Sequence, residues 1–222
     1  MFRYLFACFI TLTLLGCAET GSVQESYSSE SNQEQQQQSN TDNTMATSDL
    51  MQLQKPQTGE QIVVFETNMG TMKARLFPDL VPETYKNFVF HVEEGNYDNT
   101  IFHRVIDDFM VQGGDIEGLN GIGGYSYKGP GTTIAEEFNS DLRHHKGALS
   151  MARTSMPNST GSQFFVVENA AGTPFLDDQY SVFGQVFEGL EVIDKIADSE
   201  TDAMDKPLKD VVLTKVYLEE AK

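Results

Sequence analysis

The strongest candidate for chemistry in this sequence is a single cation, Arg104, within the segment 102–115, which reads FHRVIDDFMVQGGD. If residues 102–106 form a strand, Arg104 shares one face with the apolar residues on either side of it. An arginine on an apolar face is costly unless it is paired or used. Arg104 is therefore either a functional cation or one partner of a structural ion pair. The candidate partners in such a pair are Asp107, Asp115 and Glu137.

Other familiar catalytic patterns do not occur in the sequence. It has no HExxH motif, no GxSxG motif and no phosphate-binding loop. The histidines (His91, His103, His144 and His145) do not fall at metal-ligand spacing, and no cysteine accompanies them. Because adjacent side chains diverge on a strand or a helix, we expect His144 and His145 to face solvent. We expect no metal and no cofactor.

The composition narrows the function further. The 222 residues include 15 Lys+Arg against 33 Asp+Glu, for a formal net charge of −18. A nucleic-acid binder needs a basic surface to neutralise phosphates, so we expect no nucleic-acid partner. The 2 cysteines exclude a disulfide scaffold. Apolar residues make up only 39% of the chain, and they are unevenly distributed.

The N-terminus has the pattern of an export signal. Residues 1–16 carry one charge, Arg3, and an apolar run shorter than the ~20 residues that a membrane-spanning helix requires. The sequence LLGC at 14–17 resembles a bacterial lipobox, which implies that Cys17 is diacylated with fatty chains such as palmitate and becomes the first mature residue. Cys8 would leave with the signal. We therefore expect an exported protein anchored to a bacterial membrane through its N-terminal lipid only.

Residues 17–60 are predicted to form a disordered polar tether. The stretch is rich in Ser, Gln, Asn and Glu and shows no helical or strand period. As a flexible coil it would span roughly 35–40 Å. The competing interpretation, a Gln-rich partner-binding tract, depends on residues 35–38, which are few and diluted by Glu and Ser.

Regular patterns begin at residue 61, and residues 61–222 are predicted to form one globular domain. A hairpin with a Gly-containing turn is expected at 62–76, and helices are expected at 82–94 and 190–197. Further strands are expected at 102–106, 109–112, 148–152, 164–167, 182–186 and 211–218. Many short strands with two helices predict a mainly β domain, a closed or nearly closed antiparallel barrel.

Three motifs in the domain, taken together, resemble one known family. FHRVIDDFMVQGGD at 102–115 is followed by GALSMARTSMPNSTGSQFFVV at 147–167 and FLDDQYSVFGQV at 175–186. These motifs closely resemble the cyclophilin family of peptidyl-prolyl isomerases, or rotamases, and the resemblance runs from about residue 62 to 218. It implies a closed eight-stranded antiparallel barrel capped by two α-helices.

The resemblance also implies roles for individual residues. Arg104 matches the family's catalytic arginine, and Gln112 matches the side chain that holds the substrate carbonyl. The walls of the proline pocket would be Phe109, Met110, Phe165 and Leu176. Ala152 and Arg153 match the stretch whose backbone pairs with the peptide. Further positions lining the groove would be Gly121, Thr154 and Gln163.

The implied reaction explains why these residue types are needed. Rotation about a peptide bond meets a barrier of ~18–20 kcal/mol, and X–Pro bonds exchange slowly between two populated isomers. No bond is made or broken, so neither a nucleophile nor a metal is required. When the amide twists, its nitrogen regains a lone pair, and a guanidinium beside it stabilises that state more than the planar one. Arginine suits this role because it stays charged on an apolar face.

Three departures from the best-known eukaryotic members affect the site. Tyr180 replaces a histidine and can still form a pocket wall. Phe175 replaces a tryptophan whose N–H binds cyclosporin, so we expect weak cyclosporin binding. The ARTSMPN segment at 152–158 carries an extra residue and has Arg153 in place of an asparagine.

The expected function is acceleration of X–Pro isomerisation in exported proteins as they fold. The expected partners are proline-containing unfolded or flexible segments, and the expected state is a monomer. The alternative is a proline-peptide-binding chaperone module whose isomerase activity is incidental. A third possibility is a structural or adhesive envelope lipoprotein. Arg104 favours the enzyme, because binding alone would not require a cation there.

Overall fold

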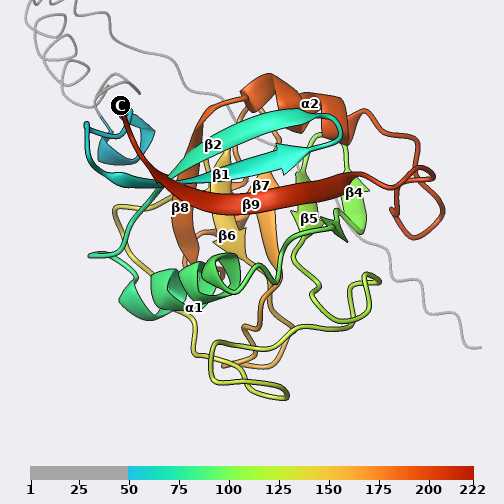
Figure 1. Ribbon diagram of the computed structural model, residues 1–222, viewed down its shortest axis with the longest axis horizontal. Coiled ribbons are helices and arrows are strands. Elements are labelled where there is room, and N and C mark those ends of the chain that lie inside the picture. The colour runs from blue at the N-terminus through green and yellow to red at the C-terminus, as the bar shows by residue number, and fades with distance from the viewer. Residues whose placement is uncertain (1–49) are drawn as a thin grey trace, which may run out of the picture. The chain divides into compact units, whose positions relative to one another are not determined.

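The computed structural model describes residues 50–222. The predicted signal peptide at 1–16, the predicted lipidation site Cys17 and most of the predicted tether lie outside the described residues. Among residues 50–222, no helix is both long enough and apolar enough to cross a membrane. The described part is mainly β, with two α-helices (Figure 1).

A single antiparallel sheet of nine strands forms the body of the molecule. Hydrogen bonding connects the strands in the order β3-β9-β1-β2-β8-β6-β7-β5-β4. The strands are β1 Gln61–Thr67, β2 Gly70–Leu76, β3 Thr100–Ile101, β4 Arg104–Ile106, β5 Met110–Gly113, β6 Ala148–Met151, β7 Phe164–Val167, β8 Val182–Glu188 and β9 Val212–Glu220. The helices are α1 Pro82–Glu93 and α2 Leu190–Ala197, with short 3-10 helices η2 Met51–Leu53 and η3 Pro174–Leu176.

The predicted hairpin and both predicted helices are confirmed. In the turn between β1 and β2, the hydroxyl of Thr67 accepts hydrogen bonds from the backbone N–H groups of Met69 and Gly70, each at 3.0 Å. Pro82 occupies the first turn of α1, where its missing N–H costs nothing. In Figure 1, α1 and α2 lie on opposite sides of the curled sheet.

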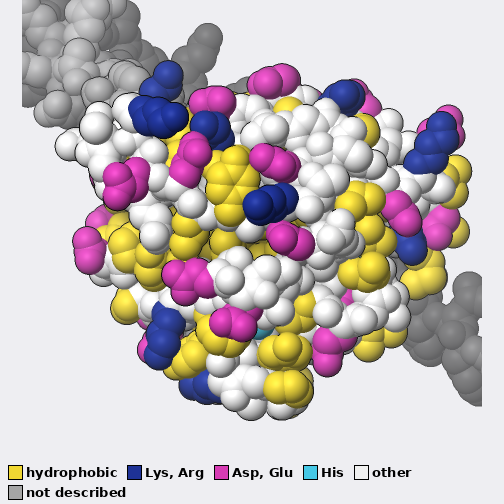
Figure 2. Space-filling model, in the orientation of Figure 1, with side chains coloured by type: hydrophobic (Ala, Val, Ile, Leu, Met, Phe, Trp, Pro, Cys, Tyr) yellow, Lys and Arg dark blue, Asp and Glu magenta, His cyan; other side chains and the backbone are white. Residues whose placement is uncertain are grey.

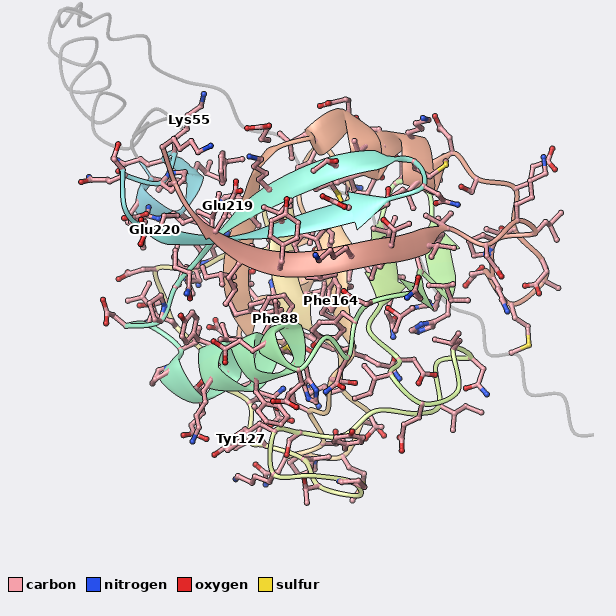
Figure 3. The ribbon with its side chains drawn as sticks, in the orientation of Figure 1. Lys55, Phe88, Tyr127, Phe164, Glu219 and Glu220 are labelled. Carbon is pink, nitrogen blue, oxygen red and sulfur yellow. The ribbon has the colours of Figure 1, made fainter. Side chains whose placement is uncertain are left out.

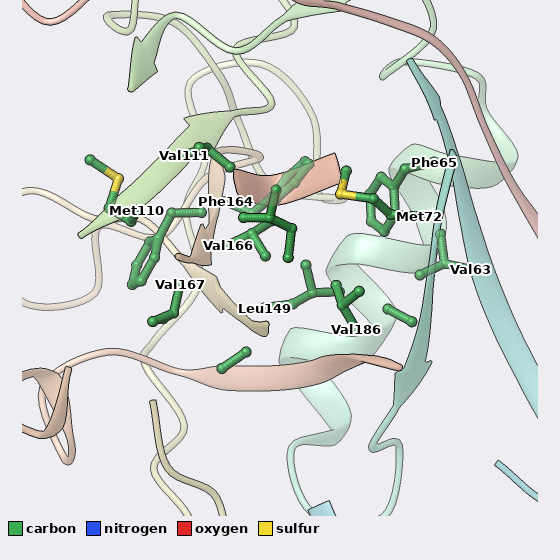
Figure 4. Packing of buried hydrophobic residues seen from close by; sticks show 14 of the residues in the cluster. Val63, Phe65, Met72, Met110, Val111, Leu149, Phe164, Val166, Val167 and Val186 are labelled. Carbon is green, nitrogen blue, oxygen red and sulfur yellow. The ribbon is translucent and has the colours of Figure 1, made fainter. Parts of the chain in front are cut away.

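The core fills the inside of the sheet and is built largely from aromatic rings. Phe88 from α1 meets Phe164 from β7 edge-on, with ring centroids 5.7 Å apart (Figure 3). Phe65 lies 5.7 Å from Phe164, and Phe183 lies 4.7 Å from Phe88. Aliphatic side chains from both halves of the sheet complete the packing (Figure 4). The fold thus depends on contacts between strands far apart in the sequence.

The predicted closed eight-stranded barrel is not what the structure shows. The expected strand 102–106 begins only at Arg104, and the preceding β3 pairs with β9 at the other edge of the sheet. No pairing joins β3 to β4 within residues 50–222, so the sheet has nine strands and is open in its hydrogen bonding. Only Phe102 and His103 separate these edge strands along the chain. Three Cα–Cα steps span at most about 11 Å, so the sheet must curl until its edges nearly meet.

Residues 50–60, predicted as part of the tether, belong to the domain instead. Gln52 is buried, and its amide donates to the carbonyl of Arg143 at 2.7 Å and to the side chain of Gln185 at 3.0 Å. It also accepts from the backbone N–H of Arg143 at 2.8 Å. Gly59 N–H donates to the carbonyl of Ala221 at 2.9 Å. The polar composition was misleading because the Gln52 amide is used to satisfy buried polar groups.

The loop after β5 is organised by one buried carboxylate, Asp115. Its oxygens accept the backbone N–H groups of Glu117, Gly118, Asn120 and Gly121 at 2.9–3.0 Å. Burial alone would raise the pKa of Asp115, but these hydrogen bonds outweigh it and hold the pKa at about 2. Asp115, one of the expected ion-pair partners of Arg104, therefore binds the backbone of this loop instead.

Protonation of Asp115 should destabilise the fold at acid pH. Because its pKa is depressed in the folded state, the stabilisation is fully present above the ordinary value of 3.8 and is lost as pH falls toward about 2. The loss should reach about 2 kcal/mol at the acid end. Denaturant unfolding at about pH 6 and about pH 3 should show roughly half of this loss, about 1 kcal/mol, and Asp115→Asn should show a smaller difference between the two conditions. The exposed Asp79→Asn is the matched control. An undiminished difference in Asp115→Asn would contradict this assignment.

Candidate active site

A small pocket opens where β4, β5 and β7 end near η3. Its volume is about 130 Å³, and its lining residues are Arg104, Phe109, Met110, Gln112, Ala152, Arg153, Phe165, Leu176 and Tyr180. A groove of about 310 Å³ adjoins it, and the groove shares Gln112, Ala152 and Arg153 with the pocket. Gly121, Thr154 and Gln163 line this groove. Of the residues expected at the site, only Phe175 lines neither cavity.

Strand register places the central residues in one row. Arg104 on β4 lies opposite Gln112 on β5, and Gln112 lies opposite Phe165 on β7. Directly opposed residues on antiparallel strands project to the same face and contact each other. The row therefore combines a cation, an amide and an aromatic ring on one face.

Aromatic residues form the apolar walls of the pocket. Met110, Phe165 and Leu176 are buried, and the ring of Tyr180 meets Phe165 edge-on with centroids 5.8 Å apart. Phe175 is 63% exposed and stacks on Phe109 with centroids 5.8 Å apart. Phe175 thus extends the wall formed by Phe109 outward without lining the cavity itself.

Behind Phe165 lies a buried polar chain that contradicts one sequence expectation. His144 was expected to face solvent, but it is 2% exposed and stacks on Phe165 with centroids 5.9 Å apart. Its Nδ1 lies 2.8 Å from Asp177 Oδ1, and its Nε2 lies 3.0 Å from Ser150 Oγ. Burial lowers the pKa of His144 although Asp177 opposes this shift, so the neutral ring donates to Asp177 and accepts from Ser150.

This serine, histidine and aspartate resemble a hydrolase triad only in composition. Ser150 has no exposed surface, so its hydroxyl cannot reach a substrate. The three side chains instead satisfy one another's hydrogen bonds and give Phe165 a rigid backing. Their role is to hold one wall of the pocket.

Arg104 is both partly exposed and paired, but its partner is not one of those expected. Its side chain is 42% exposed, and its Nε lies 3.4 Å from Oδ2 of Asp205. Of the expected partners, Asp115 binds loop amides, and Glu137 accepts from the backbone N–H of Thr84 at 2.6 Å. The pair leaves Arg104 on the lining of the pocket.

The polar side of the site is a chain of hydrogen bonds between side-chain amides and backbone carbonyls. Gln112 Nε2 donates to Gln163 Oε1 at 2.9 Å, and Gln163 Nε2 donates to the carbonyls of Gly121 and Gly123 at 3.0 and 2.7 Å. An amide nitrogen carries two hydrogens. Gln112 therefore keeps one donor for a carbonyl bound in the pocket, and its direction is fixed by Gln163.

The segment with the extra residue keeps its place in the site. Ala152 N–H donates to the carbonyl of Gln163 at 2.9 Å, which joins the segment to β7. Arg153 Nε donates to the carbonyl of Gln179 at 2.7 Å, and its guanidinium lies 5.0 Å from the centre of the Tyr180 ring. Arg153 thereby fastens the segment to the opposite wall.

One buried residue beside the site was not selected from the sequence. His103 is buried beside Arg104, and burial lowers its pKa. Gly121 packs so close to it that an added Cβ would lie 2.9 Å from His103 Cδ2. Gly121 also has φ +84°, which favours glycine. The spacing of the histidines in the sequence does not indicate that His103 contacts Gly121.

One group of carboxylates within residues 50–222 could hold a metal ion. Oxygens of Asp107, Asp108 and Glu168 lie within 4.8 Å of one another at the turn after β4. Burial raises the pKa of Glu168, and Lys146, whose Nζ is 3.9 Å away, opposes that shift. None of the three carboxylates lines the pocket, so the cluster supplies no chemistry to it.

Comparisons with known proteins agree with this geometry. Residues 62–218 match the family model for cyclophilin type peptidyl-prolyl cis-trans isomerases. A Staphylococcus epidermidis protein described as a peptidyl-prolyl cis-trans isomerase is 41% identical, with 74% of this chain and 94% of the relative covered. A Staphylococcus aureus protein of the same description is 40% identical with the same coverage.

Solved structures give the same result. The crystal structure of a Cryptosporidium parvum cyclophilin, obtained in the presence of the dipeptide Ala-Pro, matches with a TM-score of 0.67 at 33% identity. The match covers 72% of this chain and 99% of that protein. A second crystal structure of the same protein matches with a TM-score of 0.68 at 33% identity. The chain therefore belongs to the cyclophilin family, and its activity is peptidyl-prolyl cis-trans isomerisation.

Proposed function

We propose that this isomerase is exported, anchored to a bacterial membrane by a lipid on Cys17, and acts on X–Pro bonds of proteins folding outside the cytoplasm. It would act as a monomer on flexible proline-containing segments and touch the membrane only through its lipid. The observation that carries the catalytic part is Arg104, a half-exposed guanidinium on the lining of a small apolar pocket.

The size and walls of the pocket favour a proline ring. At about 130 Å³ it is far below the ~300–1,000 Å³ of pockets that take whole drug-sized ligands. Apolar walls from Phe109, Met110, Phe165 and Leu176 suit a small saturated ring. The adjoining groove, lined by Gly121, Thr154 and Gln163, would receive the residues that flank the proline.

Catalysis would come from differential binding. With the ring held by the pocket and the carbonyl held by Gln112, the amide can rotate about its C–N bond. The twisted amide places a lone pair on nitrogen, and the Arg104 guanidinium stabilises that state more than the planar ground state. The partly desolvated site strengthens this interaction relative to water.

The acidic surface fits partners other than nucleic acid. Figure 2 shows acidic and basic side chains interspersed over the visible face, with no continuous basic patch on it. With a net charge of −18, the chain would repel phosphate backbones and bare anionic lipid surfaces. Contact with a membrane would then require the lipid.

Replacement of the guanidinium should remove most activity. We expect Arg104→Ala to lower kcat/KM on an X–Pro peptide on the order of 100-fold, because the charge on the twisted amide loses its partner. A protease-coupled peptide assay on the full chain measures this. Arg75→Ala is the matched control, since Arg75 pairs with Glu60 and lines neither cavity. Full activity in Arg104→Ala would refute the mechanism.

The same variant separates the enzyme from the alternative, a chaperone module that binds proline peptides. If the module's main role were binding, Arg104→Ala would suppress aggregation of an unfolded client as well as the wild-type chain does. If isomerisation is the main role, Arg104→Ala should lose the ability to speed refolding of a client limited by proline isomerisation.

Cyclosporin should inhibit the protein weakly. Phe175 has no N–H donor, although its exposed position on Phe109 would let an indole present one to a ligand. We expect Phe175→Trp to tighten cyclosporin inhibition, measured in the peptide assay, while Phe138→Trp, also exposed, has no effect. A nanomolar inhibition constant for the wild-type chain would exclude this account.

Lipidation of Cys17 should be visible in the mass of the mature N-terminus. We expect a diacylated cysteine as the first residue and recovery of the protein with membranes, because two acyl chains give stable attachment. Cys17→Ser should move the protein to the soluble fraction with its isomerase activity unchanged. An unmodified Cys17 in the mature protein would rule out the anchor.

A further inference from the structure

We infer that Asp205 is a positioning residue for Arg104, which holds the Nε side of the guanidinium so that its terminal nitrogens are available to the substrate. This inference rests on the proposed role of Arg104. The closest approach is 3.4 Å between Arg104 Nε and Asp205 Oδ2. Asp205 belongs to the segment between α2 and β9, which lies beside β4 in Figure 1.

The segment that carries Asp205 is fastened directly to the strand of Arg104. The carbonyl of Asp205 accepts the backbone N–H of Val105 at 2.8 Å. This bond joins Asp205 to the residue that follows Arg104. The backbones that carry the carboxylate and the guanidinium are therefore held at a fixed distance from each other. Asp205 is therefore linked to β4 twice, through its carbonyl to Val105 and through its side chain to Arg104.

The segment is also rigid within itself. Oδ1 of Asp202 accepts the backbone N–H groups of Met204 and Lys206 at 2.8 and 3.0 Å. Asp202 N–H donates to the carbonyl of Lys206 at 2.8 Å, and Asp205 N–H donates to the carbonyl of Asp202 at 3.1 Å. A β-bridge between Thr201 and Pro207 closes the turn. The carboxylate of Asp205 is thus presented from a fixed backbone.

Because Asp205 pairs with Nε, the terminal nitrogens of the guanidinium are left free to bind a substrate. A guanidinium has five N–H donors, one on Nε and four on the terminal nitrogens. Within residues 50–222, Arg104 donates no hydrogen bond to the protein: its contact with Asp205 is an ion pair at Nε, and its terminal nitrogens have no protein partner. With Nε facing Asp205, those donors remain for the pocket that Arg104 lines. Loss of the carboxylate would let a 42% exposed side chain turn toward water.

The pair is too exposed to be explained by stability. The side chains of Arg104 and Asp205 are 42% and 44% exposed, and exposed ion pairs contribute little to folding. Orientation of a catalytic group is much more sensitive, because a misplacement of 1 Å can cost ~100-fold in rate. A positioning role therefore predicts an effect on turnover without one on unfolding.

The backbone of Asp205 determines which variants are informative. Its φ is +62°, in the left-handed region that glycine and asparagine tolerate and most other residues do not. Asp205→Gly removes the carboxylate and Asp205→Asn keeps one acceptor oxygen, and both suit this φ. Asp79→Asn removes the same charge at an exposed position that lines neither cavity, and serves as the matched control.

The test measures kcat, KM and thermal unfolding of the full chain with an X–Pro peptide. We expect Asp205→Gly to lower kcat about tenfold with KM unchanged, because the guanidinium is no longer held in place. Asp205→Asn should lower kcat by less than Asp205→Gly does. The unfolding midpoints of both variants should stay at the wild-type value. Wild-type kcat in Asp205→Gly, a higher kcat, or a loss explained by unfolding would each overturn the inference.

A spectroscopic measurement separates this inference from the role of Arg104 itself. The Nε–H resonance of Arg104, assigned by its loss in Arg104→Lys, should exchange with water faster in Asp205→Gly than in the wild-type chain. If that exchange rate does not change, Asp205 does not position the guanidinium. If it rises while Arg104→Ala keeps full activity, Asp205 still positions Arg104, and only the proposed catalytic role fails.

Discussion

The passage from β3 to β4 constrains the rest of this structure. The chain leaves one edge of the sheet at Ile101 and joins the opposite edge at Arg104. The sheet must curl to allow this short step, and the curl gives the aromatic core an inside to fill. It also places Arg104 on an edge strand, where one side of its backbone is not paired within the sheet. The Asp205 carbonyl uses that side, accepting the N–H of Val105.

Buried polar groups, rather than catalytic ones, give the site its shape. Asp115 gathers the amides of the loop that carries Gly121, and His144 braces Phe165 through Asp177 and Ser150. Each of these groups is buried, and each has its hydrogen bonds satisfied by neighbours. A buried polar network that is fully satisfied specifies one arrangement of the surrounding chain. The pocket is therefore preformed, which suits a reaction that depends on holding a ring still while a bond rotates.

The parts of this molecule that depend on local sequence were predictable. The hairpin at 62–76 and both helices follow from periodicity and turn residues, and the residues of the pocket follow from the resemblance of three motifs to the cyclophilin family. The parts that were not predicted are long-range partnerships. Nothing near Arg104 points to Asp205, and adjacent histidines gave no hint that His144 would stack on Phe165. Gln52 was assigned to the tether because the stretch around it is polar. Its side chain instead bonds the backbone of Arg143 and the side chain of Gln185, which lie far along the chain. The closed barrel was wrong for a different reason: β3 and β4 are only two residues apart along the chain, but β3 pairs with β9 and β4 with β5, and the two do not pair with each other.

The beginning and the end of the described chain lie together. Gly59 N–H donates to the carbonyl of Ala221 at 2.9 Å, and Ala221 N–H donates to the carbonyl of Glu60 at 2.8 Å. In Figure 1 this junction lies on the far side of the domain from β4. The described chain therefore begins and ends on the side of the domain opposite the strand that carries the guanidinium. The elements at this junction, η2, β1 and β9, share no residue with the pocket lining, so a load applied at residue 50 would be carried by parts of the fold outside the pocket.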